Sequence, residues 1–376
     1  MPKVLIVTGE ASGDQHGANL AEALRAADPT VELHGIGGAR MAAAGVRQLQ
    51  GLRRLDHMGL AGLTVLRDGY YNYRRIAEYL RKERFHAVVL IDNAGLNLRL
   101  AKVAKAAGHR VVYYIAPQIW ASRPKRIEVI KRVVDLVLVI FPFEPPIYER
   151  AGVACRYVGH PLLDQVAPHY DVAVLRQQFG VAGDGPVIGL LPGSRVREID
   201  MLLPPMLDAA RRIQVALPEC RFVLAQASSV SDGLLARHLG TSAVPVTVIS
   251  GRPSEVMASA DLLLVASGTA TLQAALVGTP MILTYKTTWL TYHIVRRVIL
   301  VEWIGLVNIL AGREVVPELI QHEATGERLS QESIRLLRDR AAYDKMKHAL
   351  FEVRRSLGPP GASTRAAQAV LEVCAA

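Results

Sequence analysis

The chain has 376 residues, of which 51% are hydrophobic and 21% charged, and its formal net charge is +10. This length exceeds what one hydrophobic core usually organises, and the composition is globular, which excludes intrinsic disorder. There is no export signal at the start, no uncharged apolar stretch long enough to span a bilayer, and no cysteine spacing that indicates a disulfide framework or a zinc site. We therefore expect two domains in a reducing cytoplasm, with no bound metal.

Short apolar runs in the first half of the chain predict buried parallel strands. They begin at Lys3, His86, Arg110 and Asp135. The segments between them carry apolar residues at helical spacing, as in residues 18–24 and 127–134. Strands that alternate with helices in this way indicate a βαβ series around a parallel sheet.

The strand pattern stops between Leu163 and Pro186, in a stretch rich in polar residues, glycine and proline, and we place a domain boundary there. A second series of apolar runs then begins at Pro186, Arg221, Pro245, Asp261 and Pro280. Helical patterns follow Lys286 and end in an alanine-rich helix beyond Gly361.

The sequence thus predicts an α/β fold with two Rossmann-like domains that face each other across a cleft. Residues 1–165 form the first domain, residues 166–345 form the second, and helices in residues 346–376 can pack back on the first domain. A ligand site is expected where the carboxyl ends of the strands meet the cleft.

Glycine-containing turns follow several of these strands and precede helices. One runs from Gly9 to Asp14, and the second domain contains Gly193-Ser194-Arg195 and Ser267-Gly268-Thr269. Glycine permits a tight turn, and the free N–H groups at a helix start bind anions, so the second-domain turns suit a diphosphate. Arg195 would add a bidentate contact to phosphate oxygens. A plain capped turn is the alternative for each, with the first helix starting near Asp14.

Longer motifs occur along the chain in one order. They are GEASGD at Gly9, GIGGARMAAAG at Gly35, YYIAPQIWASRPKRIEVI at Tyr113, FPFE at Phe141, YVGHPLLD at Tyr157, LLPGSR at Leu190, ASGTATL at Ala266 and AGREVVPELIQ at Ala311. In this order and spacing they resemble the lipid-A-disaccharide synthase family. The resemblance holds from the first strand to beyond Gln321, and is therefore specific.

The resemblance implies a metal-independent, inverting glycosyltransferase of the GT-B class, glycosyltransferase family 19, which needs no cofactor. Such enzymes transfer an acylated glucosamine from UDP-2,3-diacylglucosamine to 2,3-diacylglucosamine 1-phosphate, form a β-1,6 linkage and release UDP. The family pattern places UDP on the second domain at Gly193, Ser194, Arg195, Ser267, Gly268, Thr269 and Gln273. It places the lipid-bearing acceptor on the first domain at Gly9, Glu10, Ser12, Gly13, Asn97 and Trp120.

The chain departs from the family pattern at several acidic positions. The aspartate of the family's PDFN segment, the usual candidate for catalysis, is Gly95 here, and acidic residues expected elsewhere are Gly62 and Gln273. Gln273 keeps a carbonyl oxygen that can accept a hydrogen bond from a ribose hydroxyl.

Inverting transfer needs a base within hydrogen-bond reach of the acceptor hydroxyl. Three residues could replace the missing carboxylate, and our order of preference is Asp14, Asp92 and His16. Each has a plainer interpretation, because Asp14 can cap a helix, Asp92 can hydrogen-bond at a strand end, and His16 can be an exposed helix residue.

The positive charge favours an anionic partner. Tyrosines and basic residues between Tyr70 and Arg84 follow the apolar stretch from Met58 to Leu66 and suit the anionic inner face of the plasma membrane, as does the mixture from Trp289 to Leu300. A core helix with a solvated basic face is the alternative. No nucleic-acid-binding module is recognised, so we expect no nucleic-acid partner. A homo-oligomer remains open.

Three functions follow from these observations. The first is the parent synthase activity at the inner membrane face. The second is a diverged homologue with a different acceptor, or a nucleotide-sugar-binding protein with little transferase activity. The third is a UDP-sugar 2-epimerase of the GT-B fold, which cleaves UDP from its substrate without an acceptor.

Overall fold

The computed structural model describes residues 1–9, 11–52 and 63–376. The chain divides into two compact units, of which the first contains Met1–Asp164 and Pro359–Ala376 and the second contains Gln165–Gly358. The terminal segment that joins the first unit therefore begins at Pro359, whereas the sequence analysis separated the terminal helices at residue 346. Among the described helices, none combines the length and apolar character needed to cross a bilayer.

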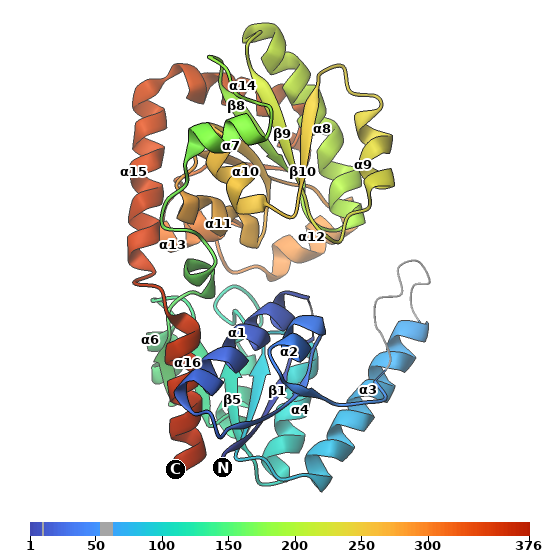
Figure 1. Ribbon diagram of the computed structural model, residues 1–376, viewed down its shortest axis with the longest axis vertical. Coiled ribbons are helices and arrows are strands. Elements are labelled where there is room, and N and C mark those ends of the chain that lie inside the picture. Colours follow the sequence, from blue (N-terminus) through green and yellow to red (C-terminus); the bar gives the residue numbers. More distant parts are fainter. Residues whose placement is uncertain (10, 53–62) are drawn as a thin grey trace. The chain divides into compact units, whose positions relative to one another are not determined.

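The first unit is built on a parallel sheet with the strand order β3-β2-β1-β4-β5-β6-β7 over the described residues. Its strands are β1 (Lys3–Val7), β2 (Glu32–Ile36), β3 (Arg47–Gln48), β4 (Ala87–Ile91), β5 (Arg110–Tyr114), β6 (Leu136–Val139) and β7 (Cys155–Tyr157). Its helices are α1 (Ala11–Ala27), α2 (Ala39–Ala43), α3 (Leu63–Lys82), α4 (Ala94–Ala106), α5 (Arg126–Val133), α6 (Pro145–Arg150), the 3₁₀ turn η1 (Pro161–Asp164) and α16 (Ala362–Ala375). Figure 1 shows α16 beside α1, far from it in sequence, and the two helices pack together.

The second unit repeats this architecture with the strand order β10-β9-β8-β11-β12-β13. Its strands are β8 (Val187–Leu191), β9 (Arg221–Gln226), β10 (Val246–Ser250), β11 (Leu262–Ala266), β12 (Met281–Tyr285) and β13 (Glu318–Ile320). Its helices are α7 (Val172–Gln178), α8 (Val196–Ala216), α9 (Asp232–Leu239), α10 (Pro253–Ser259), α11 (Thr269–Val277), α12 (Trp289–Val298), α13 (Leu306–Ala311), η2 (Gln321–Glu323), α14 (Gly326–Arg338) and α15 (Arg340–Ser356).

The complete burial of the central strands explains why helices cover both faces of each sheet. In β4, β8 and β11 every residue is buried, because helices cover both faces of a parallel sheet and leave no solvated face. Since each buried strand needs a crossover to the next, the helices between the strands must supply the apolar covering faces. The predicted α/β fold with two Rossmann-like units is confirmed.

The direction of chain progression reverses once in each sheet. In the first unit the chain moves outward from β1 to β2 and β3, and then returns to place β4 on the other side of β1. In the second unit the same reversal places β11 beside β8. Ligands of open α/β sheets bind outside the carboxyl ends of the strands at such a reversal point. The topology therefore directs attention to the loops after β1, β4, β8 and β11.

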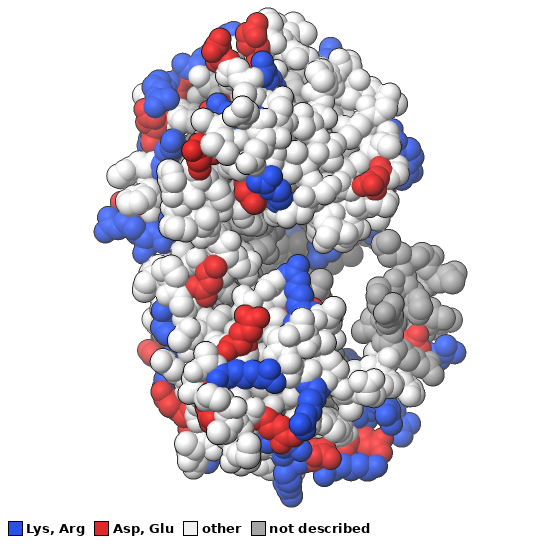
Figure 2. Space-filling model, in the orientation of Figure 1, with Lys and Arg blue, Asp and Glu red and all other residues white. Residues whose placement is uncertain are grey.

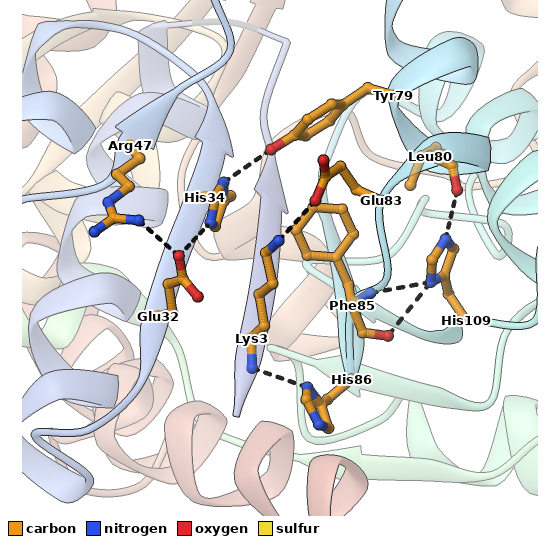
Figure 3. Close-up of polar contacts among 10 residues, drawn as sticks. All are labelled: Lys3, Glu32, His34, Arg47, Tyr79, Leu80, Glu83, Phe85, His86 and His109. Atoms are coloured by element: carbon orange, nitrogen blue, oxygen red, sulfur yellow. Dashed lines mark hydrogen bonds and ion pairs between the residues drawn. The ribbon is translucent and has the colours of Figure 1, made fainter. Parts of the chain in front are cut away.

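A polar network lies at the opposite, amino-terminal end of the first sheet and fixes α3 to it (Figure 3). The Tyr79 hydroxyl lies 2.8 Å from His34 Nδ1, and His34 Nε2 lies 3.1 Å from the carboxylate of Glu32. Lys3 forms an ion pair with Glu83 at 2.8 Å, and its Nζ lies over the ring of Phe85. These contacts are far from the reversal point, so we assign them to stability of the fold.

Candidate functional site

The two turns predicted to bind a diphosphate lie at the reversal point of the second sheet. Val265 of β11 pairs with Leu191 of β8, so the chain leaves both strands at neighbouring positions. The turn after β8 is Gly193-Ser194-Arg195, and the turn after β11 is Ser267-Gly268, with α11 starting at Thr269. The fold thus brings together the groups that the sequence analysis assigned to one ligand.

The turn after β8 contains a carboxylate that the sequence analysis missed. Glu198 Oε2 accepts hydrogen bonds from the backbone N–H groups of Ser194 at 3.0 Å and Arg195 at 3.3 Å, and its Oε1 lies 2.8 Å from Arg195 Nη1. A Cβ on Gly193, whose φ is 112°, would lie 2.4 Å from Oε2, which explains the glycine. Glu198 sits at the third position of α8, where a glutamate side chain can reach back to the N-cap backbone N–H, and a glutamate three residues after the turn was the available signal.

The turn after β11 is open. Gly268 has a φ of 147°, a Cβ added to it would have no heavy atom within 4 Å, and both Gly268 and Thr269 are exposed. The Thr271 hydroxyl donates to the Gly268 carbonyl at 2.8 Å and so fixes the turn. Gln273 Nε2 donates to Ser254 Oγ at 2.7 Å, which engages the amide nitrogen and not the carbonyl oxygen assigned to a ribose.

In the first unit the chain makes close and strained turns at the carboxyl ends of β1, β4 and β5. A Cβ on Gly9 would lie 2.2 Å from Asn93 Nδ2, so only glycine fits there. Asp92, Asn93 and Ile115 all have positive φ, at 51°, 36° and 56°. Each such residue costs about 1–3 kcal/mol, and such residues cluster at functional sites. The cluster coincides with the reversal point between β1 and β4.

Asn97 holds the end of β4 rather than facing a ligand. It is fully buried, and its Nδ2 donates to the carbonyl oxygens of Ile91 at 2.9 Å and Asp92 at 2.8 Å. The Tyr113 hydroxyl donates to the same Asp92 carbonyl at 2.6 Å. These bonds fix the backbone from which the exposed Asp92 side chain projects. Asn97 Oδ1 is buried without a hydrogen-bond partner.

Asp14 lies within the first turn of α1, which starts at Ala11. Its carboxylate caps a different helix, α2, by accepting the backbone N–H groups of Gly38 at 2.7 Å, Arg40 at 3.1 Å and Met41 at 3.1 Å. A carboxylate with three backbone donors is committed to that helix end. Of the neighbouring predicted residues, Gly13 is buried, and Glu10 lies outside the described residues.

His16 is mostly buried and not exposed as its plainer interpretation held. Burial lowers the pKa of its imidazole to about 4, and its Nδ1 has no hydrogen-bond partner. His160 follows β7, and burial, with the nearby His16 as a second cause, lowers its pKa to about 3. His160 Nδ1 accepts the backbone N–H of Leu162 at 3.2 Å. Both rings are therefore neutral near pH 7.

Trp120 lies in the loop after β5 and is half-buried. Its indole Nε1 donates to Glu144 Oε1 at 3.0 Å, and its ring makes edge contacts with Phe143 at 5.0 Å and Phe141 at 6.1 Å between ring centroids. Glu144 is a second carboxylate that the sequence analysis did not single out, although it belongs to the FPFE motif.

Two doubly wound sheets, each with loops at a reversal point, define the class of proteins with two Rossmann-like domains, and solved structures share this fold. The chain is similar to Staphylococcus aureus MnaA in complex with UDP, with a TM-score of 0.67 and 12% identity over 97% of this chain and 94% of that one. It is also similar to MurG of Acinetobacter baumannii, with a TM-score of 0.58 and 14% identity over 99% and 100% of the two chains. At these identities the likeness concerns the fold.

The sequence relatives are more specific. A family model described as lipid-A-disaccharide synthetase matches residues 4–373. Lipid-A-disaccharide synthases of Trichlorobacter lovleyi and Myxococcus xanthus are 44% and 41% identical, each over 99% of this chain and 97% of the relative. The chain belongs to the lipid-A-disaccharide synthase family, and it is a glycosyltransferase that uses a UDP-sugar.

Proposed function

We propose that the protein transfers 2,3-diacylglucosamine from its UDP derivative to 2,3-diacylglucosamine 1-phosphate, with inversion, giving the lipid A disaccharide 1-phosphate and UDP. The observation that carries this proposal is the pair of turns after β8 and β11, which lie side by side at the reversal point of the second sheet. Family membership over residues 4–373 supports the acylated glucosamines as substrates.

On the donor side, the exposed turn at Gly268 and the start of α11 would bind the diphosphate of UDP through backbone N–H groups. The Arg195 side chain is 75% exposed and paired with Glu198, so it can turn to phosphate oxygens while Glu198 keeps the turn in shape. The Gln273 carbonyl oxygen would accept a hydrogen bond from a ribose hydroxyl.

On the acceptor side, we now favour Asp92 as the base that takes the proton of the attacking hydroxyl. Asp92 is exposed at the end of β4, whereas Asp14 caps α2. His16 is the second candidate, since a neutral imidazole with an unpartnered nitrogen can accept a proton. Gly9 would form the neighbouring wall, with Asn97 fixing the backbone of Asp92.

The decisive experiment incubates the protein with both acylated substrates and measures disaccharide and UDP. Disaccharide formation supports the proposal, whereas UDP release from the donor alone with a rearranged sugar would indicate an epimerase. Asp92→Asn should lower kcat by about 10²-fold or more, as expected for loss of a base, and leave UDP affinity unchanged. Asp14→Asn should lower thermal stability through the end of α2; a selective loss of kcat instead would restore Asp14 as the base.

The donor site has a matched pair of variants at the two ends of α11. Gly268 and Gly278 both have positive φ, 147° and 90°, and neither has a heavy atom within 4 Å of an added Cβ. Alanine should strain either turn, but only Gly268→Ala should raise the Kd for UDP, by about tenfold or more. Equal UDP affinity in the two variants, measured by calorimetry, would remove the turn after β11 from the site.

We further propose that the protein works at the anionic inner face of the plasma membrane, where its acylated substrates reside, and is otherwise cytoplasmic. The described part of α3 supports this with basic and tyrosine side chains, among them the exposed Tyr70. Of the preceding apolar stretch from Met58 to Leu66, residues 58–62 lie outside the described residues.

A further inference from the structure

Glu144 is a buried carboxylate that joins two loops at the carboxyl end of the first sheet. Only 1% of its surface is exposed. Its Oε2 accepts the backbone N–H groups of Ile140 at 3.2 Å and Phe141 at 3.0 Å, and its Oε1 accepts Trp120 Nε1 at 3.0 Å. The first two donors belong to the turn after β6, and the indole belongs to the loop after β5, so one side chain fixes both.

The loop after β5 is held at several points along its length. It leaves the strand at Ile115, whose φ of 56° is strained for a β-branched residue. The Pro117 carbonyl accepts the Tyr148 hydroxyl at 3.3 Å, and Ile119 is only 2% exposed. With Trp120 bonded to Glu144, the loop is held in one shape, and Trp120 remains partly exposed.

This loop adjoins the residue that we propose as the base. β5 pairs with β4, and the backbone N–H of Asp92 donates to the Tyr114 carbonyl at 3.2 Å, so the ends of the two strands lie together. An indole carried by this loop is a suitable platform for the apolar C–H face of a pyranose ring.

A buried carboxylate is a costly way to hold a loop. Burial raises the pKa of Glu144 to about 7, against hydrogen bonds that lower it. The titratable side chains that interact electrostatically with Glu144 are Tyr148 of α6 and Cys155 and Tyr157 of β7, and burial raises the pKa of each, so none of them is charged near neutral pH. The carboxylate is the group that can accept all three donors at once, since protonation would place an O–H among them.

We propose that Glu144 is a positioning residue for sugar transfer, which holds Trp120 as the stacking platform for the glucosamine ring of the acceptor. The inference rests on the proposed transfer and adds the subsite for the acceptor sugar. Trp120 contacts the substrate, and Glu144 acts through Trp120.

The kinetic test compares Glu144→Gln and Trp120→Phe with Glu149→Gln, an exposed carboxylate on α6, the helix that follows Glu144. Each of the first two should raise the acceptor KM about tenfold and leave the donor KM within about twofold, and the double variant should resemble the single ones because the residues act as a pair. Glu149→Gln should match the wild type. A fall in thermal stability with both KM values unchanged would show a purely structural role and overturn the proposal.

The pH dependence of the acceptor KM is a measurement that a purely structural role of Glu144 would not change. In the wild type the acceptor KM should rise as the pH falls below about 7, where Glu144 takes up a proton and loses an acceptor site. Glu144→Gln should remove this dependence and have a high acceptor KM at every pH. An unchanged acid limb in the variant would contradict the proposal.

A binding measurement keeps the inference separate from the transferase activity. When Trp289 and Trp303 are replaced by phenylalanine, Trp120 is the remaining tryptophan of the 3 in the chain. Soluble glucosamine 1-phosphate should change its fluorescence, and Glu144→Gln should weaken that response about tenfold. If the wild type binds in this way but forms no disaccharide, the proposed reaction fails and the subsite stands; if transfer occurs with no change in Trp120 emission, the subsite fails alone.

Discussion

Several carboxylates in this protein accept hydrogen bonds from backbone N–H groups and so fix turns and helix ends, a role that their positions in the sequence do not suggest. Asp14 accepts three N–H groups at the start of α2, Glu198 closes the turn after β8, and Glu144 joins two loops. The partners of Asp14 lie up to 27 residues away in sequence, and the Trp120 partner of Glu144 lies 24 residues away, so no local pattern could reveal these contacts. The partners of Glu198 lie 3 and 4 residues away, and a glutamate at the third position of a helix was the one readable signal.

Gly95 stands where the family pattern has a carboxylate, so restoring that carboxylate tests whether its absence limits the reaction. It lies in the first turn of α4, and an added Cβ would have only Asn93 Oδ1 nearby, at 3.7 Å. Gly95→Asp should therefore fold normally, with a gain of a few tenths to about 1 kcal/mol from the helix start. If the chain lacks an efficient base, kcat should rise about tenfold or more, because a placed base contributes ~10²–10⁴-fold.

The control is Gly95→Asn, which has the same shape without the charge, so steady-state kinetics of the two variants isolate the carboxylate. Equal kcat values in both variants would show that Asp92 or another group already supplies the base.

The two buried histidines predict how stability depends on pH. Burial lowers the pKa of His16 to about 4 and that of His160 to about 3, whereas both titrate near 6.5 in the unfolded chain. Between these values the unfolded state binds more protons, so their contribution is fully present above about pH 6.5 and is lost as the pH falls. Each histidine contributes at most about a few kcal/mol to this change in the free energy of unfolding.

Urea unfolding of the wild type and of His16→Asn at several pH values from 7 to 4 checks this prediction. In the variant, the slope of the free energy of unfolding against pH should be smaller, by the equivalent of up to about one bound proton. Identical slopes would mean that His16 is not shielded from water.

At the scale of the elements, apolar content determined which strands the sequence revealed. The predicted runs gave β1, β4, β5 and β6 of the first sheet and β8 to β12 of the second. The missed strands were β2, β3, β7 and β13, which contain short polar sequences such as ELHGI and CRY. Of these, β3, β7 and β13 are edge strands, which have one neighbour and carry no continuous apolar run.

The attachment of α3 can be tested at Tyr79. Tyr79→Phe removes the hydroxyl that lies 2.8 Å from His34 Nδ1 but keeps the ring that packs on Phe85. We expect a loss of about 1 kcal/mol, the usual contribution of one hydrogen bond. Tyr70→Phe on the same helix is the control, since Tyr70 is 63% exposed and its change should stay within about 0.5 kcal/mol.

Amide hydrogen exchange along α3 measures both variants locally. Faster exchange confined to Tyr79→Phe would support the attachment, and equal protection in both variants would show that packing alone fixes the helix.

For the whole molecule, the net charge of +10 is the property relevant to the membrane proposal. Figure 2 shows Lys and Arg interspersed with Asp and Glu over the visible face, so attraction through that face should be a sum of weak contributions. The protein should sediment with vesicles of phosphatidylglycerol and not with phosphatidylcholine, and binding should fall as salt shortens the screening length. Equal binding to both lipids at all salt concentrations would show that the protein binds through insertion of apolar side chains and not through its charge.

The first unit is discontinuous in sequence, because α16 packs against α1 and also contacts β4 and β5. Its buried face comprises Ala362, Ala366, Ala367, Ala369 and Val370, and the Asp164 carboxylate accepts the backbone N–H of Gly361 at 2.5 Å. During translation, residues 165–358 emerge from the ribosome before this helix does. The second unit can therefore mature on the nascent chain, while the first keeps an uncovered apolar face until α16 arrives, and this interval is when chaperones would be needed.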